Sequence, residues 1–151
     1  MAGIYFDHHQ SLGFMTITAN RLMCAAVRRR MLQAGIDLTA EQWGVLAQVW
    51  NQGGLAQDEL ARFACVEKSS MSRVLAGLER KGLLERRPDP DDARRKNVFS
   101  TPAADAIKER CRDVVQDVLD QALREVSPQD RATCLNVLAM VKQTMQDTDN
   151  P

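Results

Sequence analysis

The sequence lacks the residue clusters that build metal centres. Its two histidines are adjacent at His8 and His9, and its cysteines at positions 24, 65, 111 and 134 contain no C-x-x-C pair. This distribution excludes a zinc framework of the usual spacing, so we expect no metal site. It favours instead a reduced cytoplasmic protein in which the cysteines are small buried hydrophobic side chains.

Long apolar runs are also missing, and we expect no leader segment. No apolar run approaches the roughly 20 residues that cross a bilayer, and residues 1–10 lack a basic start followed by an apolar run. We therefore expect a cytoplasmic location and no membrane partner. The sequence contains no recognisable Ser-His-Asp set, no paired carboxylates with the signature of a cleft and no glycine-rich phosphate loop. We therefore expect neither an enzyme nor a cofactor.

The chain has no net charge, but its charges are unevenly distributed. Residues 62–100 hold ten basic and six acidic side chains, whereas residues 1–61 hold four and five, and residues 101–151 hold six and nine. The positive field therefore lies on the middle segment, as it does in proteins that bind nucleic acid through one face. Because a basic run is more often a solvated surface, charge alone does not decide the function.

Apolar residues at helical spacing predict a mainly helical chain, and 151 residues favour one domain. A first helix is expected over residues 8–32, with Gly35 as its stop signal. Thr39 and Gln42 have the spacing of a capping box that begins a second helix. We expect the buried face of this second helix to consist of Trp43, Leu46, Ala47 and Trp50.

Two short helices and a basic hairpin are predicted next. The helices cover residues 57–63 and 68–81 and are joined by a turn at residues 65–66. The second of them should bury Met71, Val74, Leu75 and Leu78. Strands are expected over residues 84–87 and 97–100. A helix with a small polar face beside a cationic hairpin is what a reader of duplex DNA needs.

The chain should end in two long helices, one from Thr101 to about Glu125 and one that starts at Ser127 and Pro128. Their apolar stripes are Ile107, Cys111, Val114, Val118 and Ala122 in the first, and Leu135, Leu138, Val141 and Met145 in the second. A second copy of the chain would cover these stripes and place two reading helices roughly 34 Å apart. The alternative is that the helices pack on their own core.

Four segments follow one another in the order and at the spacing of a known family. They are Leu38–Leu46, Gln57–Ala61, Ser69–Leu83 and the hairpin segment Asp89–Arg94. This series resembles the MarR family of bacterial winged-helix transcriptional regulators, most closely over residues 38–104. The resemblance implies a single MarR-like domain over residues 1–151, all-α with a small β-hairpin wing (α+β). In this winged helix-turn-helix, residues 38–101 would form the DNA-binding lobe, and residues 8–35 and 102–147 the dimerisation helices.

Four positions depart from the family's pattern. Ala93 occupies a position where a second basic wing residue is common, and Ala104 replaces a frequent glycine. Ala56 and Glu67 are weaker helix caps than the usual residues, which costs about 1 kcal/mol each.

The resemblance also implies roles in DNA binding. Arg94 would enter the minor groove from the wing tip, and Asp92 would orient an arginine. The other expected DNA contacts are Lys68, Ser69, Ser70, Ser72, Arg73, Arg86, Arg87 and Arg95. Two alternatives stay open: the serines could merely cap the helix, and the hairpin could be a solvated surface with weak local ion pairs.

The function implied is that of a sequence-specific DNA-binding transcriptional regulator. We expect a homodimeric repressor that a small aromatic or phenolic ligand releases from a palindromic operator. The expected wall of the ligand pocket is Met15, Leu22, Trp43 and Leu46, although the tryptophans of the second helix could simply pack in the core.

The sequence leaves two other functions as alternatives. A thiol-based redox sensor would use Cys24, but the only tyrosine that could accompany it is Tyr5. A winged helix used only for protein contacts should lack the basic run at residues 94–96.

Overall fold

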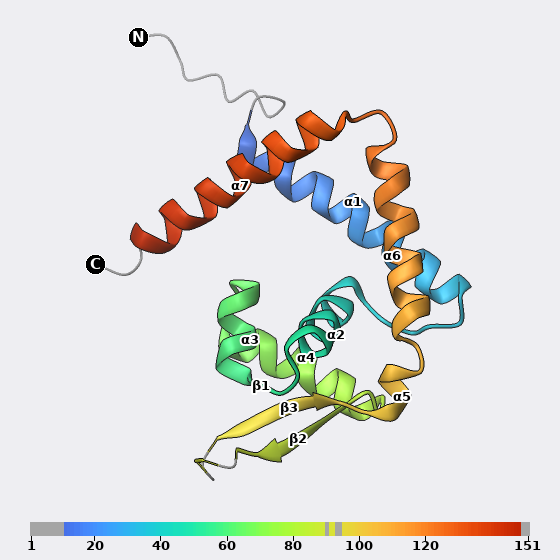
Figure 1. Ribbon diagram of the computed structural model, residues 1–151, viewed down its shortest axis with the longest axis vertical. Helices are drawn as coiled ribbons and strands as arrows, with labels where there is room; N and C mark the ends of the chain where they lie inside the picture. The colour runs from blue at the N-terminus through green and yellow to red at the C-terminus, as the bar shows by residue number, and fades with distance from the viewer. Residues whose placement is uncertain (1–10, 90, 93–94, 149–151) are drawn as a thin grey trace. The chain divides into compact units, whose positions relative to one another are not determined.

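The computed structural model describes residues 11–89, 91–92 and 95–148. It confirms a mainly helical fold with a small antiparallel sheet (Figure 1). The chain forms two compact units, the first of which ends at Gln116 while the second begins at Asp117. None of the helices in these ranges is long and apolar enough to cross a membrane.

The first helix, α1, spans Leu12–Gln33 and begins where the Ser11 side chain accepts a hydrogen bond from the Phe14 N–H (3.3 Å). The expected first turn near His8 lies outside the described residues. Gly35 ends the helix as predicted, because its φ of +72° suits glycine and the next residue, Ile36, bonds back to the Met31 carbonyl (2.8 Å).

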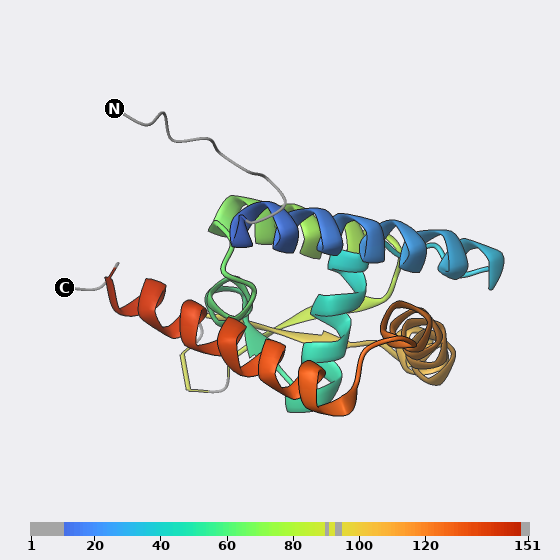
Figure 2. The same ribbon diagram turned by 90° about the horizontal axis from the view of Figure 1, so that it is seen from above.

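Helix α2 spans Ala40–Gln52 and has the predicted capping box, in which Thr39 and Gln42 exchange two hydrogen bonds. It touches α1, α4 and the third strand, so it lies at the centre of the first unit (Figure 2). The predicted buried face was partly wrong, because Trp43, Ala47 and Trp50 are only half-buried. The residues that face the neighbouring elements are Val45, Leu46, Gln48 and Val49.

Helices α3 (Gln57–Ala64) and α4 (Lys68–Arg80) agree with their predicted bounds to within one residue. The turn between them has Cys65 in the left-handed region, with a φ of +52°. The next residue, Val66, donates its N–H to the Ala61 carbonyl (3.0 Å), which closes the turn. Met71, Leu75 and Leu78 of α4 are buried as predicted, whereas Val74 is half-buried.

The sheet has the strand order β1-β3-β2, with β1 at Leu55–Ala56, β2 at Leu84–Pro88 and β3 at Lys96–Ser100. Both pairings are antiparallel, and Val98 is opposite both Leu55 and Arg86. The hairpin of β2 and β3 was predicted, but β1 was not. Two residues are too short for an alternating pattern, and β1 exists only because it pairs with the free edge of β3.

The predicted continuous helix from Thr101 to about Glu125 is wrong, because the chain forms α5 (Pro102–Asp105) and α6 (Lys108–Leu123) with a break between them. Tertiary contacts fix the short first helix: Ala104 is fully buried, and Asp105 accepts a hydrogen bond from Trp50 Nε1 (2.9 Å). These contacts override the continuous helical periodicity.

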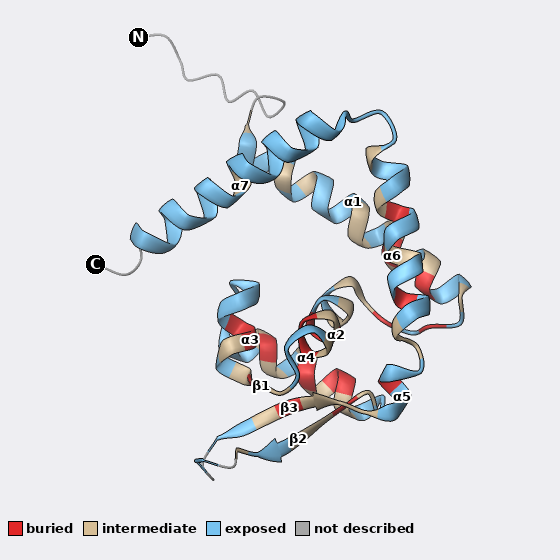
Figure 3. Cartoon of the chain, viewed as in Figure 1, coloured by how far each residue is buried: buried red, intermediate tan, exposed pale blue. Residues whose placement is uncertain are grey.

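The second unit contains the end of α6 and helix α7, Pro128–Thr148. Ser127 begins α7 as predicted, since its Oγ accepts from the Asp130 N–H (3.1 Å). No described residue of α7 is buried, in contrast to the cores of α2, α3 and α4 (Figure 3).

Candidate nucleic-acid interface

Helix α4 presents a short polar face that begins at its first residue. Lys68, Ser69 and Arg73 are exposed, and Ser70 and Ser72 are half-buried. The Lys68 Nζ lies 3.0 Å from Asp58 Oδ2, so part of its charge is neutralised within the protein. Arg73 forms no ion pair with any residue that the structure describes. Arg73 is therefore more available than Lys68 for contact with DNA.

The N-terminus of α4 is not capped by a side chain, because Glu67 accepts no hydrogen bond there. At α3, Ala56 has no acceptor either, and the Glu59 carboxylate instead accepts from the Ala56 N–H (2.8 Å). The first N–H groups of a helix attract anions when no side chain occupies them. The weak cap at Glu67 thus leaves donors available at the start of the polar face.

Two hairpin arginines are held by other residues of the lobe. The Arg86 guanidinium is half-buried and donates to Glu79 Oε1 (2.8 Å) and Gln57 Oε1 (3.2 Å), which joins β2 to α4 and α3. Arg87 pairs with Glu85, and its guanidinium lies 4.7 Å from the centre of the Phe99 ring. The geometry favours a bracing role for Arg86 over contact with phosphate.

The loop of the hairpin is organised by Asp89, a role that was not predicted from the sequence. Its Oδ1 accepts from the backbone N–H groups of Asp91 (2.8 Å) and Asp92 (3.1 Å), and its Oδ2 accepts from Asn97 Nδ2 (2.8 Å). These hydrogen bonds, with the charge of Arg95, lower the pKa of the Asp89 carboxyl below its usual range. An aspartate followed by Pro-Asp-Asp was the available signal, since aspartate often bonds to the backbone two residues on.

The tip of the hairpin is only partly described. Arg95 is exposed, and its backbone N–H donates to the Asp92 carbonyl (2.9 Å). Ala93 and Arg94 lie outside the described residues, so the minor-groove role of Arg94 and the orienting role of Asp92 stay predictions.

An apolar groove of about 360 Å³ lies between α2, α3 and α4. The buried side chains of Val45, Leu60 and Met71 line this groove, together with the exposed side chains of Phe63 and Val66. None of the four residues predicted to line a ligand pocket lines this groove. Met15 and Leu22 are exposed on α1, Trp43 is half-buried, and Leu46 is fully buried.

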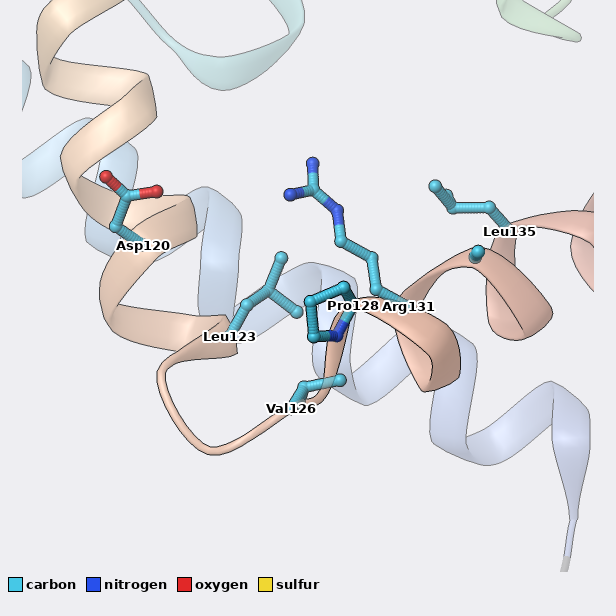
Figure 4. A pocket seen from close by; sticks show the side chains of 7 residues that line it. Asp120, Leu123, Val126, Pro128, Arg131 and Leu135 are labelled. Atoms are coloured by element: carbon cyan, nitrogen blue, oxygen red, sulfur yellow. The ribbon is translucent and has the colours of Figure 1, made fainter.

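A second hollow, of about 490 Å³, lies within the second unit (Figure 4). Leu123, Val126 and Pro128 approach one another at the α6–α7 connection, with the Arg131 guanidinium projecting beside them. Leu135 continues this apolar surface along α7, where it is 57% exposed.

The sequence predicted that the cysteines are small buried side chains, and this is only partly correct. Cys111 is buried, Cys24 is half-buried, and Cys65 and Cys134 are exposed. Burial, together with the negative charge of Glu41, raises the pKa of the Cys24 thiol, and burial also raises that of Cys111. Within the described ranges, no three His, Cys, Asp or Glu side chains gather closely enough to hold a metal ion.

The helix pair α3–α4, joined by a tight turn and followed by an arginine-bearing hairpin, defines a winged helix-turn-helix protein of the DNA-binding class. A sequence model described as the MarR family matches residues 38–96. The multiple antibiotic resistance protein MarR of Salmonella typhimurium is 33% identical over 103 residues, which cover 68% of this chain and 72% of that protein. The chain therefore belongs to the MarR family, whose members are transcriptional regulators and not enzymes.

Solved structures agree with this assignment. A probable transcriptional regulator from Pseudomonas aeruginosa is 29% identical with a TM-score of 0.79, over 88% of this chain and 98% of that one. A mutant MarR from Escherichia coli complexed with operator DNA is 27% identical with a TM-score of 0.80, over 91% and 97% of the two chains.

Proposed function

We propose that this regulator is a homodimeric repressor that binds a palindromic operator through α4 and the hairpin and is released by a small aromatic or phenolic ligand. The observation that carries the proposal is the exposed polar face of α4 beside the basic hairpin. The similarity to a MarR protein complexed with operator DNA supports the same use of these elements. Operator binding would place the protein in the cytoplasm.

The proposed DNA contacts differ in kind. Arg73 would reach a phosphate or a guanine edge from α4, and a bidentate guanine contact discriminates by roughly 1–3 kcal/mol. Arg94 would enter the minor groove, with Asp92 orienting it. Phosphate contacts would come from Lys68, Ser69, Ser70, Ser72, Arg87 and Arg95, and from Arg86 only if it leaves Glu79.

Exposed apolar stripes on α1 and α7 support the homodimer. On α1, Leu22 is 74% exposed, and Leu12, Met15 and Ile17 are also exposed. On α7, the exposed apolar side chains are Leu135, Val137, Met140, Val141 and Met145. Several large apolar side chains exposed on one helix are typical of a protein interface. A second copy of the chain would cover it.

Release by a ligand is favoured over a thiol switch. A redox-sensing cysteine needs thiolate character, whereas the surroundings of Cys24 raise the pKa of its thiol. The thiol switch therefore stays the alternative with the weaker support. The ligand wall at Met15, Leu22, Trp43 and Leu46 requires a second chain to enclose Met15 and Leu22, because both are exposed in the single chain.

Titration of DNA from upstream of the gene tests the proposal, at two salt concentrations and with or without salicylate as the phenolic probe. We expect tight binding that weakens with salt, because phosphate contacts release counterions, and that weakens further with salicylate. Cys24→Ser should respond to salicylate as the wild type does. Binding that is lost with peroxide and unaffected by salicylate would contradict the ligand mechanism, and absence of binding at both salts would contradict the DNA-binding role.

A further inference from the structure

Asp37, in the connection between α1 and α2, pairs with two cations, one on α1 and one at the end of α4. Its Oδ1 lies 2.7 Å from Arg28 Nη1 on α1, and its Oδ2 lies 3.1 Å from Lys81 Nζ. Lys81 is the residue directly after α4. One carboxylate therefore joins α1 to the end of the helix that carries the polar face.

Lys81 extends this network to α2. Its ammonium group also donates to the Asp37 carbonyl and to Gln42 Oε1 (3.1 Å). The same Gln42 oxygen accepts from the Thr39 N–H (3.2 Å) in the capping box. Helices α2 and α4 approach closely here, since a Cβ on Gly77 would lie 2.9 Å from Gln42 Nε2. The network thus joins α1, α2 and the end of α4.

The network defines geometry more than it adds stability. The side chains of Arg28 and Lys81 are 36% and 30% exposed, but that of Asp37 is 64% exposed. Ion pairs with this much exposure contribute little to the free energy of unfolding. The Arg28 guanidinium and then the Lys81 ammonium lower the pKa of the Asp37 carboxyl, so it is ionised at neutral pH.

We infer that Asp37 is a positioning residue for DNA recognition, which holds α4 in a fixed orientation relative to α1 through Arg28 and Lys81. The inference rests on the proposed function, in which α4 reads DNA and α1 belongs to the dimer region. A fixed α4 loses less freedom on binding than a mobile one. In a dimer, the same restraint would set the distance between the two reading helices and make binding sensitive to half-site spacing.

The test is a series of operators with the natural half-site spacing and with one base pair more or less, titrated with wild type and Asp37→Ala. The variant should bind the natural spacing about threefold to tenfold more weakly, the effect of losing two exposed ion pairs. The loss of affinity should be smaller on operators with altered spacing, because an α4 that is less fixed in orientation can adapt to them. The difference in affinity between the natural and the altered half-site spacings should therefore be smaller for Asp37→Ala than for the wild type.

Two further variants separate positioning from charge. Glu109→Ala removes the same charge from an ion pair with Arg112 that stays within α6, and it should keep the wild-type preference. Asp37→Glu retains a carboxylate and should restore much of the preference. Thermal unfolding and sedimentation of each variant verify that fold and dimer are intact.

Equal losses at all spacings, or a wild-type preference in Asp37→Ala, would overturn the inference and leave the proposed function in place. If the wild type binds no operator, the proposed function fails, and the inference fails with it.

Discussion

The Asp89 side chain accepts three hydrogen bonds inside the hairpin loop, two from backbone N–H groups and one from Asn97. It precedes the segment in which Arg94 is proposed to reach DNA. At the scale of single residues, the shape of the cationic hairpin thus depends on one anionic side chain, that of Asp89. A free aspartate would repel phosphate, whereas the Asp89 carboxylate accepts hydrogen bonds from two backbone N–H groups of the loop.

Replacement of Asp89 should weaken operator binding by disordering the loop. Asp89→Ala removes both carboxylate oxygens and the three hydrogen bonds that they accept, so we expect several-fold lower affinity without loss of the fold, measured by fluorescence anisotropy. Asp91→Ala is the matched control, because it removes the same charge from an exposed side chain. The control should bind as well as the wild type or slightly better, and equal losses in both variants would contradict the role of Asp89.

The lowered pKa of Asp89 also fixes how the loop responds to acid. A carboxyl whose folded pKa lies below its unfolded pKa stabilises the folded loop fully above the unfolded value. This contribution is lost as the pH falls through the lowered folded pKa. NMR titration of the Asp89 carboxyl and of the Asp91 amide should therefore show the loop unchanged through neutral and mildly acidic pH. A loop transition near neutral pH would contradict this account.

Cys65 has a left-handed backbone conformation that L-residues adopt with strain. Glycine avoids that strain but loses more entropy on folding, so Cys65→Gly should raise the free energy of unfolding by about 0.5–1 kcal/mol. Cys65→Ala keeps the Cβ and should have nearly wild-type stability. Urea denaturation of the three proteins measures the difference, and a less stable glycine variant would show that the Cys65 side chain itself stabilises the turn.

At the scale of elements, the sheet approaches the end of α2 through a contact that only glycine allows. A Cβ on Gly54 would lie 2.5 Å from Phe99 Cε1, and Gly54 has a φ of +69°. Phe99 in turn lies under Arg87. The position of β3, and with it the base of the hairpin, therefore depends on a residue without a side chain.

Gly54→Ala should destabilise the lobe by about 2–4 kcal/mol, from backbone strain plus the steric contact with Phe99. Gly35→Ala is the control, since Gly35 has a similar φ of +72° but no neighbour within 4 Å of an added Cβ. Gly35→Ala should lower the free energy of unfolding only by the cost of backbone strain, about 1 kcal/mol. Equal effects in thermal unfolding would mean that Phe99 moves aside without cost.

Local signals predicted the elements that depend on neighbouring residues. The capping box of α2, the stop at Gly35 and the turn at Cys65 all rest on bonds within six residues. The features that were missed depend on distant residues. Strand β1 needs β3, the break after α5 needs Trp50, and the Asp37 network joins residues up to 44 positions apart. Of the site, the polar face of α4 was predictable, whereas the bracing of Arg86 was not.

At the scale of the whole molecule, α7 has an apolar stripe and no buried residue in its described length. In a single chain, a charge on this stripe costs little, whereas in a dimer it would lie in the interface. Leu135→Glu should therefore lower the dimer fraction in sedimentation equilibrium and leave the circular dichroism spectrum unchanged. Asn136→Glu introduces the same charge about 100° around the helix from Leu135, and it should sediment more like the wild type than Leu135→Glu does. An unchanged dimer in Leu135→Glu would place the interface elsewhere.

The central claim is that α4 and the hairpin together bind operator DNA. Equilibrium titration of one operator with wild type and Arg94→Ala tests it most directly, with thermal unfolding as the check on the fold. The account predicts that the variant stays folded and dimeric but binds at least about tenfold more weakly, a loss of about 1.4 kcal/mol or more. An operator affinity equal to that of the wild type would contradict the role of the hairpin in DNA binding.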